Sequence, residues 1–225
     1  MFLTKFKPVL KWILGAGALL ALAIVMVAGY ALLVLAPGLP ALDAVTDYRP
    51  KVPLRIYTDD DVLIGEFGQE RRDFVPIEDM PAQLKNAVVA IEDERFYSHA
   101  GVDPKAIVRA MLSFVTGGVP QGGSTITIQV ARTFYLTQER TLARKLKEAM
   151  LAERIEASLT KDKILELYMN QIYLGQRSYG FSSAARTYFG KPMDELSIAE
   201  SAMLARLPQN PARHNPVVNP ARAQK

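Results

Sequence analysis

The pattern of hydrophobic and polar positions begins with one long apolar run. From Trp12 to Ala36 no residue is charged, and Leu, Ala, Val and Ile dominate. The run exceeds the ~20 residues that a helix needs to cross a bilayer. It is also longer than the ~7–15 apolar residues of a cleavable signal peptide. We therefore predict an uncleaved transmembrane anchor over residues 12–36, in preference to a signal peptide or a buried core helix.

Two weaker patterns follow the anchor. Residues 37–53 are punctuated by prolines and predict an extended linker. Residues 54–76 hold two short β-like runs about an acidic turn, which predicts a hairpin. The turn residues Asp59, Asp60 and Asp61 lack the loop glycine and distal glutamate of an EF-hand, so a solvated turn is favoured over a calcium site.

From Met80 onward the periodicity becomes helical, so residues 77–225 are predicted to form one mainly α domain. Helix 104–118 has an unusually apolar surface. Two interpretations stay open for it: the helix belongs to the core, or, in a chain tethered to a bilayer, it dips into the membrane interface.

Charge predicts the orientation of the anchor and excludes one function class. Lys5, Lys7 and Lys11 precede the apolar run and stand before the first acidic residue. Positive flanks favour the cytoplasmic side, so residues 1–11 form a predicted cytoplasmic tail and the rest is exported after a single pass. These lysines supply most of the net charge of +4. The almost neutral remainder argues against nucleic-acid binding, and the absence of cysteine excludes disulfides and Cys-ligated zinc.

Glu92 is the first candidate for chemistry. Leu84, Val88 and Ile91 share one helix face, and Glu92 borders that stripe because it follows Val88 by four residues. Apolar neighbours disfavour the charged form of a carboxylate and raise its pKa, which suits a general base. The alternative, a surface acid at an acidic helix end, is equally compatible with the pattern.

A glycine-rich loop over residues 117–123 leads to Ser124 and Thr125, which can cap the next helix. Free N–H groups and hydroxyls at a helix start suit a phosphate. The loop lacks the Lys-Ser/Thr ending of a P-loop, so nucleotide binding is not indicated.

Glu148 is the second candidate. Arg140, Arg144 and Glu148 share a helix face at spacings of four, and Lys145 flanks Glu148. Several cations around one carboxylate lower its pKa and keep it ionised. The alternative is an ordinary Arg–Glu pair on a solvated helix.

The segments EDERFYSHAG, QGGSTITIQ, RKLKE and KILELYMNQIYLG resemble successive signature motifs of the peptidoglycan glycosyltransferases, glycosyltransferase family 51. LARLPQNPARHNP resembles the closing motif of that family, and the likeness covers residues 71–225. It implies an all-α, lysozyme-like bilobal domain with a groove beside the membrane. It also implies lipid II as substrate, a disaccharide-pentapeptide carried on undecaprenyl pyrophosphate in the bacterial inner membrane.

The resemblance implies roles for individual residues. Glu92 would be the general base that activates the acceptor 4-hydroxyl. Glu148 would be the second carboxylate, which assists the donor pyrophosphate with nearby cations or a divalent metal such as Mg²⁺ or Mn²⁺. No metal site built from protein ligands and no organic cofactor is implied. The substrate-binding positions that match are Arg109, Gln121, Ser124, Thr125, Gln129, Arg132, Arg140, Arg144 and Lys145.

Two departures from the family pattern stand near the site. Ile128 precedes Gln129 where a glutamine pair is common, and Arg132 stands where lysine is common. A planar guanidinium is not equivalent to an ammonium.

The hairpin segment also resembles the one that precedes this domain in class A, bifunctional penicillin-binding proteins. We therefore expect an N-terminal part of a longer protein, although no SxxK transpeptidase motif occurs here. The expected partners are lipid II, the growing glycan strand, membrane lipid and cell-wall synthesis proteins. The alternatives are a lysozyme-like glycan hydrolase, which has no need of the cationic helix or the anchor, and an inactive cell-wall scaffold, against which both retained glutamates argue.

Overall fold

The computed structural model describes residues 3–48, 54–60, 62–67, 71–117, 123–136, 141–218 and 220. Most of these residues are helical, and the few strands are short. The predicted mainly α fold class is therefore confirmed, together with the apolar N-terminal helix and the short hairpin.

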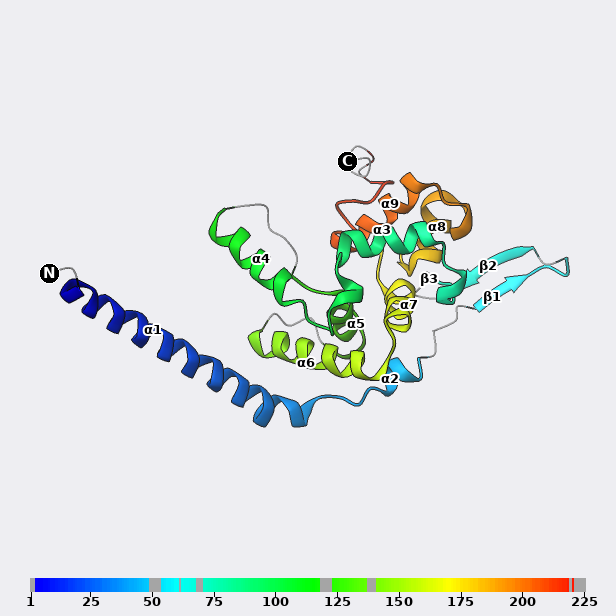
Figure 1. Cartoon of the computed structure of the whole chain (residues 1–225). Coiled ribbons are helices and arrows are strands. Elements are labelled where there is room, and N and C mark those ends of the chain that lie inside the picture. The colour runs from blue at the N-terminus through cyan, green and yellow to red at the C-terminus, as the bar shows by residue number, and fades with distance from the viewer. Residues whose placement is uncertain are drawn as a thin grey trace.

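The apolar run forms helix α1 (Leu3–Tyr30), which continues into η1 (Ala31–Leu35) and η2 (Ala36–Gly38). In Figure 1 this helix leaves the body of the molecule and carries the N-terminus far from it. Residues Lys11–Gly38 are long and apolar enough to cross a membrane, and only 6% of their most apolar window is buried in the protein. An exposed apolar surface of this length fits a helix whose solvent is hydrocarbon.

The segment after α1 docks on the body instead of running free. Residues Asp43–Thr46 form the short helix α2, and Val45 is completely buried in the core. Leu39, Leu42 and Tyr48 pack against the same core. The proline pattern predicts an extended linker here, but the apolar residues between the prolines have a hydrophobic partner surface.

The predicted hairpin is present. Strands β1 (Leu54–Tyr57) and β2 (Leu63–Phe67) pair antiparallel and project from the body (Figure 1). The hydroxyl of Thr58 closes the turn by accepting the backbone N–H of Val62 at 2.9 Å. Asp59 and Asp60 lie in this turn, and Asp61 is outside the described residues. A second, two-residue pairing joins β3 (Arg71–Arg72) to β4 (Ser178–Tyr179) in parallel.

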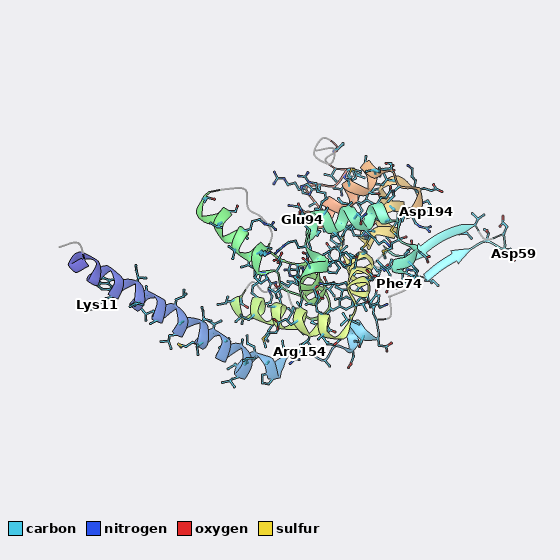
Figure 2. All side chains as sticks on the ribbon, in the orientation of Figure 1. Lys11, Asp59, Phe74, Glu94, Arg154 and Asp194 are labelled. Atoms are coloured by element: carbon cyan, nitrogen blue, oxygen red, sulfur yellow. The ribbon has the colours of Figure 1, made fainter. Side chains whose placement is uncertain are left out.

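The body is built around α7 (Lys161–Gln171), which is among the most completely buried helices of the described chain. Helix α5 (Ile126–Tyr135) packs against both α7 and α6 (Leu142–Ser158). Helix α3 (Ala82–Glu92) packs against α9 (Ile198–Arg206). The remaining elements are η3 (Ile77–Asp79), η4 (Phe96–Ser98), α8 (Phe181–Phe189), η5 (Met193–Glu195) and η6 (Leu207–Gln209). Figure 2 shows the side chains crowded among these helices, with Asp59 at the hairpin tip away from them.

Helix α4 (Pro104–Val115) stands apart from this core (Figure 1). Asp103 begins the helix by accepting the backbone N–H groups of Lys105 and Ala106 at 2.9 and 3.1 Å. Val108 and Leu112, four residues apart, are 56% and 58% exposed. None of the α4 side chains that the structure describes is buried, which favours the interface interpretation; the side chains of Met111, Phe114 and Val115 lie outside the described ones.

Candidate active site

A cavity of about 670 Å³ opens where α3 ends, α4 begins, and the first turns of α5 face η6. These four elements are far apart in sequence, and the packing of α3 on α9 brings η6 to the same place. The cavity collects the following residues of the predicted site: Glu92, Arg109, Ser124, Gln129 and Arg132.

Glu92 is the last residue of α3, half-buried in the cavity wall. Gln129 Nε2 donates a hydrogen bond of 2.8 Å to Glu92 Oε2. Glu92 Oε1 is buried and makes no hydrogen bond of good geometry with the described residues. Burial raises the pKa of Glu92, and the contacts from Gln129 and Gln209 offset this rise only in part. The geometry therefore favours the desolvated carboxylate over the surface acid.

Gln129 is itself oriented from behind. The hydroxyl of Tyr168 donates to Gln129 Oε1 at 3.5 Å, which leaves the amide nitrogen to face Glu92. Tyr168 is 2% exposed and lies on the central helix α7. The sequence pattern assigns Tyr168 to the core, and the structure adds a polar contact that only the folded chain reveals.

Glu148, on α6, has a fully buried side chain. Arg132 Nε lies 3.0 Å from Glu148 Oε1, and Lys145 Nζ lies 2.8 Å from Oε2. Arg144 Nε approaches Oε1 at 3.3 Å. Burial opposes ionisation, but the hydrogen bonds and charges of Lys145 and Arg132 together outweigh it and lower the pKa of Glu148. Glu148 is therefore held as an anion inside a ring of cations.

Helix α5 connects the two carboxylates. Gln129 and Arg132 lie one turn apart on it, so one contacts Glu92 while the other contacts Glu148. Arg132 Nη2 also approaches Ser124 Oγ at 3.3 Å. The guanidinium thus bridges the cavity wall and the buried anion.

The other predicted site residues have different positions. Thr125 is 2% exposed and caps α5 by accepting the Ile128 N–H at 3.1 Å, while its own hydroxyl donates to the Gly101 carbonyl. Ile128 is also buried, at 8% exposure, and it is not among the residues that line the cavity. Arg144 and Lys145 each form an ion pair with Glu148, and this contact links them to the site. Gln121 and Arg140 lie outside the described residues.

The donor set around Glu148 does not suit a divalent cation. Each of its carboxylate oxygens already faces a cationic side chain. Within the described ranges no three His, Cys, Asp or Glu side chains gather as a metal site would require. Hard divalent cations prefer several free oxygen ligands. We therefore expect the positive charge beside Glu148 to come from Arg132, Arg144 and Lys145.

Three features of the site were not predicted. Gln209, on η6, faces Glu92 and lines the cavity with Pro208. Arg95 forms a short ion pair with Asp103 beside the cavity. Asp93 is buried next to Glu92 and contacts His99. The closing motif LARLPQNP could have pointed to Gln209, whereas the partners of Asp93 and Arg95 follow from the tertiary fold.

The chain is similar to known proteins in sequence. A family model described as Transglycosylase matches residues 60–225. Penicillin-binding protein 1A of Neisseria flavescens is 53% identical over 219 residues, covering 97% of this chain and 27% of that protein. Penicillin-binding protein 1A of Pseudomonas aeruginosa is 47% identical over 194 residues, covering 86% of this chain and 24% of that protein. The chain thus spans about a quarter of the length of these relatives.

Among solved structures, penicillin-binding protein 1A from Haemophilus influenzae is similar at 28% identity with a TM-score of 0.40. The match covers 78% of this chain and 17% of that chain.

Proposed function

The chain belongs to the transglycosylase family, and from this premise we propose that it polymerises lipid II into β-1,4-linked glycan strands of peptidoglycan. The observation that supports this proposal most directly is that α5 contacts two carboxylates with opposite surroundings. Gln129 of α5 contacts Glu92, a carboxylate of the cavity wall without a cationic partner among the described residues. Arg132 of α5 lines the same cavity and contacts Glu148, a buried carboxylate surrounded by cations behind that wall. Transfer of a sugar from a pyrophosphate needs a base and a cationic leaving-group site, and these two carboxylates with their neighbours supply them.

Glu92 acts as the general base in this proposal. Its carboxylate takes the proton of the GlcNAc 4-hydroxyl on the acceptor, and the oxygen forms a bond to the anomeric carbon of the donor MurNAc. The bond from that carbon to the pyrophosphate breaks, and its electron pair leaves with undecaprenyl pyrophosphate, so the configuration inverts. The raised pKa of Glu92 makes it a stronger base, and Gln129 holds one of its oxygens in place.

The cationic side of the cavity stabilises the leaving group. Negative charge grows on the pyrophosphate as the bond breaks, and fixed positive charge lowers the energy of that state. Arg132 and Arg109 line the cavity there, and Ser124 offers a hydroxyl. Glu148 contributes by fixing Arg132 and Lys145, so these cations need not reorganise during the reaction.

The substrate is a membrane lipid, so the site has to lie close to the bilayer. Helix α1 supplies the anchor, with the N-terminus in the cytoplasm and the domain on the outer side of the bacterial inner membrane. The exposed apolar face of α4, formed by Val108 and Leu112, enters the membrane interface beside the cavity. The growing glycan strand and cell-wall synthesis proteins are the proposed partners.

The test is polymerisation of labelled lipid II by the detergent-solubilised chain, beside Glu92→Gln and Glu153→Gln. Glu153 is an exposed carboxylate on α6, so its variant serves as a matched control. We expect long glycan strands from the wild type and the control and none from Glu92→Gln. Binding of lipid II without polymer by the wild type would support the scaffold interpretation, and cleavage of preformed strands would make the protein a hydrolase.

A further inference from the structure

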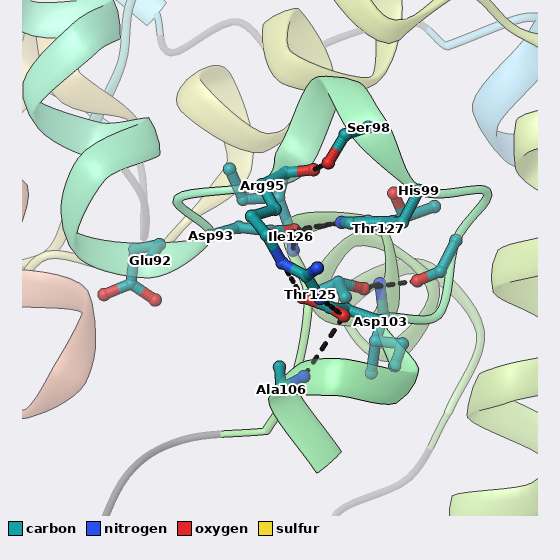
Figure 3. A network of polar contacts seen from close by, with 12 residues as sticks. Glu92, Asp93, Arg95, Ser98, His99, Asp103, Ala106, Thr125, Ile126 and Thr127 are labelled. Carbon is teal, nitrogen blue, oxygen red and sulfur yellow. Dashed lines mark hydrogen bonds and ion pairs between the residues drawn. The ribbon is translucent and has the colours of Figure 1, made fainter. Parts of the chain in front are cut away.

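Asp93 follows Glu92 directly and points the other way. Helix α3 ends at Glu92, and in Figure 3 the Glu92 carboxylate turns away from the polar cluster formed by Asp93, His99 and the start of α5. Asp93 is 8% exposed, and the His99 side chain is 6% exposed. Buried polar groups of this kind need hydrogen-bond partners of good geometry.

The partners of Asp93 join two helices. Its Oδ2 accepts the backbone N–H of Ile126, the first residue of α5, at 3.0 Å. His99 Nε2 lies 3.0 and 2.9 Å from the two carboxylate oxygens. Asp93 therefore connects the C-terminal end of α3 to the N-terminal end of α5, and His99 holds the carboxylate in that orientation (Figure 3).

We propose that Asp93 and His99 are positioning residues that set the distance between Glu92 and Gln129. This inference rests on the proposed function, because it concerns the alignment of the same general base. Glu92 is adjacent to Asp93 in the chain, and Gln129 lies one turn after Ile126 on α5. Any change in the link from Asp93 to Ile126 therefore moves the base relative to the amide that holds it.

The start of α5 offers suitable hydrogen-bond donors for such a link. The first N–H groups of a helix have no partner within the helix, and a carboxylate is favoured there by the helix dipole. Thr125 satisfies a second one, from Ile128, and ties itself to the Gly101 carbonyl. Two side-chain links thus hold the first turn of α5 against the segment between Asp93 and Gly101.

Both oxygens of Asp93 are engaged inside the protein, by His99 and by Ile126. Each oxygen of Asp93 thus has a partner inside the protein, whereas Oε1 of Glu92 has none among the described residues. A misplacement of about 1 Å in a reacting group can lower a rate by ~10²-fold. This is the magnitude expected when the link between the two helices is cut.

The experiment compares Asp93→Ala, Asp93→Asn and His99→Ala in the full chain, with kcat and KM for labelled lipid II. We expect Asp93→Ala to lower kcat by ~10²-fold with KM within about twofold, because alignment and not binding is lost. Asp93→Asn keeps an oxygen that accepts the Ile126 N–H, so its kcat should fall by less than ~10-fold. Hydrogen exchange of residues 126–131 should accelerate in Asp93→Ala.

The matched control is Glu166→Gln. Glu166 is also a buried carboxylate that accepts a backbone N–H, from Ile77 at 3.0 Å, and pairs with a cation, Lys163. It lies outside the cavity, so its variant should lose thermal stability without a change in kcat.

Two outcomes would overturn the inference. Equal kcat values for Asp93→Ala and Glu166→Gln, with both variants folded, would show that Asp93 contributes only to the stability of the fold. Equal inactivity of Asp93→Asn and Asp93→Ala would point to proton transfer by Asp93 itself. If Asp93→Ala does not fold, His99→Ala decides: it keeps the Ile126 link but frees the carboxylate, and a kcat equal to that of the wild type would reject the role of the pair.

Failure of the proposed function would look different. A wild-type chain that makes no polymer contradicts the transferase assignment. The exchange rates at the start of α5 would still show whether Asp93 and His99 hold the two helices together.

Discussion

The two glutamates of the site show how burial alone does not decide the state of a carboxylate. Glu92 is desolvated beside amides, and its pKa rises. Glu148 is also desolvated, yet Lys145 and Arg132 lower its pKa. Desolvation disfavours the charged form in both, and the presence of cations reverses the result only at Glu148. Environments that separate the pKa values of two carboxylates are typical of a divided catalytic role.

Gln129→Met is expected to change the pH dependence of polymerisation. The Gln129 amide donates to the ionised form of Glu92 and lowers its pKa, so its loss raises that pKa further. A general base must be ionised, so the rate falls as the pH drops through its pKa. The acidic limb of kcat/KM should therefore move to higher pH in the variant. Tyr168→Phe removes the contact that orients the Gln129 amide, so it should move the limb in the same direction by a smaller amount; an unmoved limb in Gln129→Met would contradict this assignment of the base.

Arg132 tests whether the shape of the cation matters as well as its charge. Its guanidinium contacts Glu148 and Ser124 together, which one ammonium does not reproduce. Arg132→Lys keeps the charge and should lose one hydrogen bond. The resulting fall in kcat/KM should correspond to about 0.5–1.5 kcal/mol. Arg132→Met removes the positive charge and should lower kcat by ~10²–10³-fold, the loss seen when a hydrogen-bond donor to the transition state is removed. Steady-state kinetics on lipid II measures both, and a Met variant as active as the wild type would exclude Arg132 from the reaction.

Sequence predicted the character of single residues better than their partners. The apolar stripe beside Glu92 correctly indicated a desolvated carboxylate, and the charge spacing correctly placed Arg144 and Lys145 beside Glu148. Both signals lie within one helix. The contacts of Glu92 with Gln129 and of Glu148 with Arg132 join different helices, so no local spacing encodes them.

At the scale of elements, α4 is the helix whose surroundings the pattern could not decide. An apolar face predicts that something apolar covers it, but the same face fits a protein core and a membrane interface. The structure leaves Val108 and Leu112 uncovered by the described chain. A similar ambiguity affected α2, where a proline-punctuated stretch turned out to carry the buried Val45.

The double variant Val108→Asp/Leu112→Asp tests the interface role of α4. Two charges on this face cost little in water but oppose insertion among lipids. We expect polymerisation in liposomes to fall by about tenfold or more, with a much smaller change in detergent. Ile198→Asp, at a position 76% exposed on α9, is the matched control. Equal losses in liposomes and in detergent would instead indicate damage to the fold.

At the scale of the whole molecule, the anchor and the catalytic body meet at a small contact. Segment η1 packs against α6, and the groove between them is lined by Ala31, Leu32, Met150 and Ala157. Glu148 lies on the same helix α6. The apolar N-terminal segment is thus attached to the helix that carries Glu148 and Lys145, so in the proposed function α6 would connect the anchor to these charged residues.

Two N-terminal truncations separate anchoring from folding. A chain that starts at Ala31 lacks α1 but keeps the buried Leu35 of η1 and the completely buried Val45 of α2. It should fold with a Tm close to that of the full chain in detergent and should no longer sediment with membranes.

A chain that starts at Arg49 also loses α2. Exposing the surface under Val45 alone removes about 1.5–3 kcal/mol of hydrophobic stabilisation. Its Tm should therefore be several degrees lower, by about 2–4 °C per kcal/mol for a domain of this size. Equal Tm values for the two truncations would show that α2 is not part of the folded body.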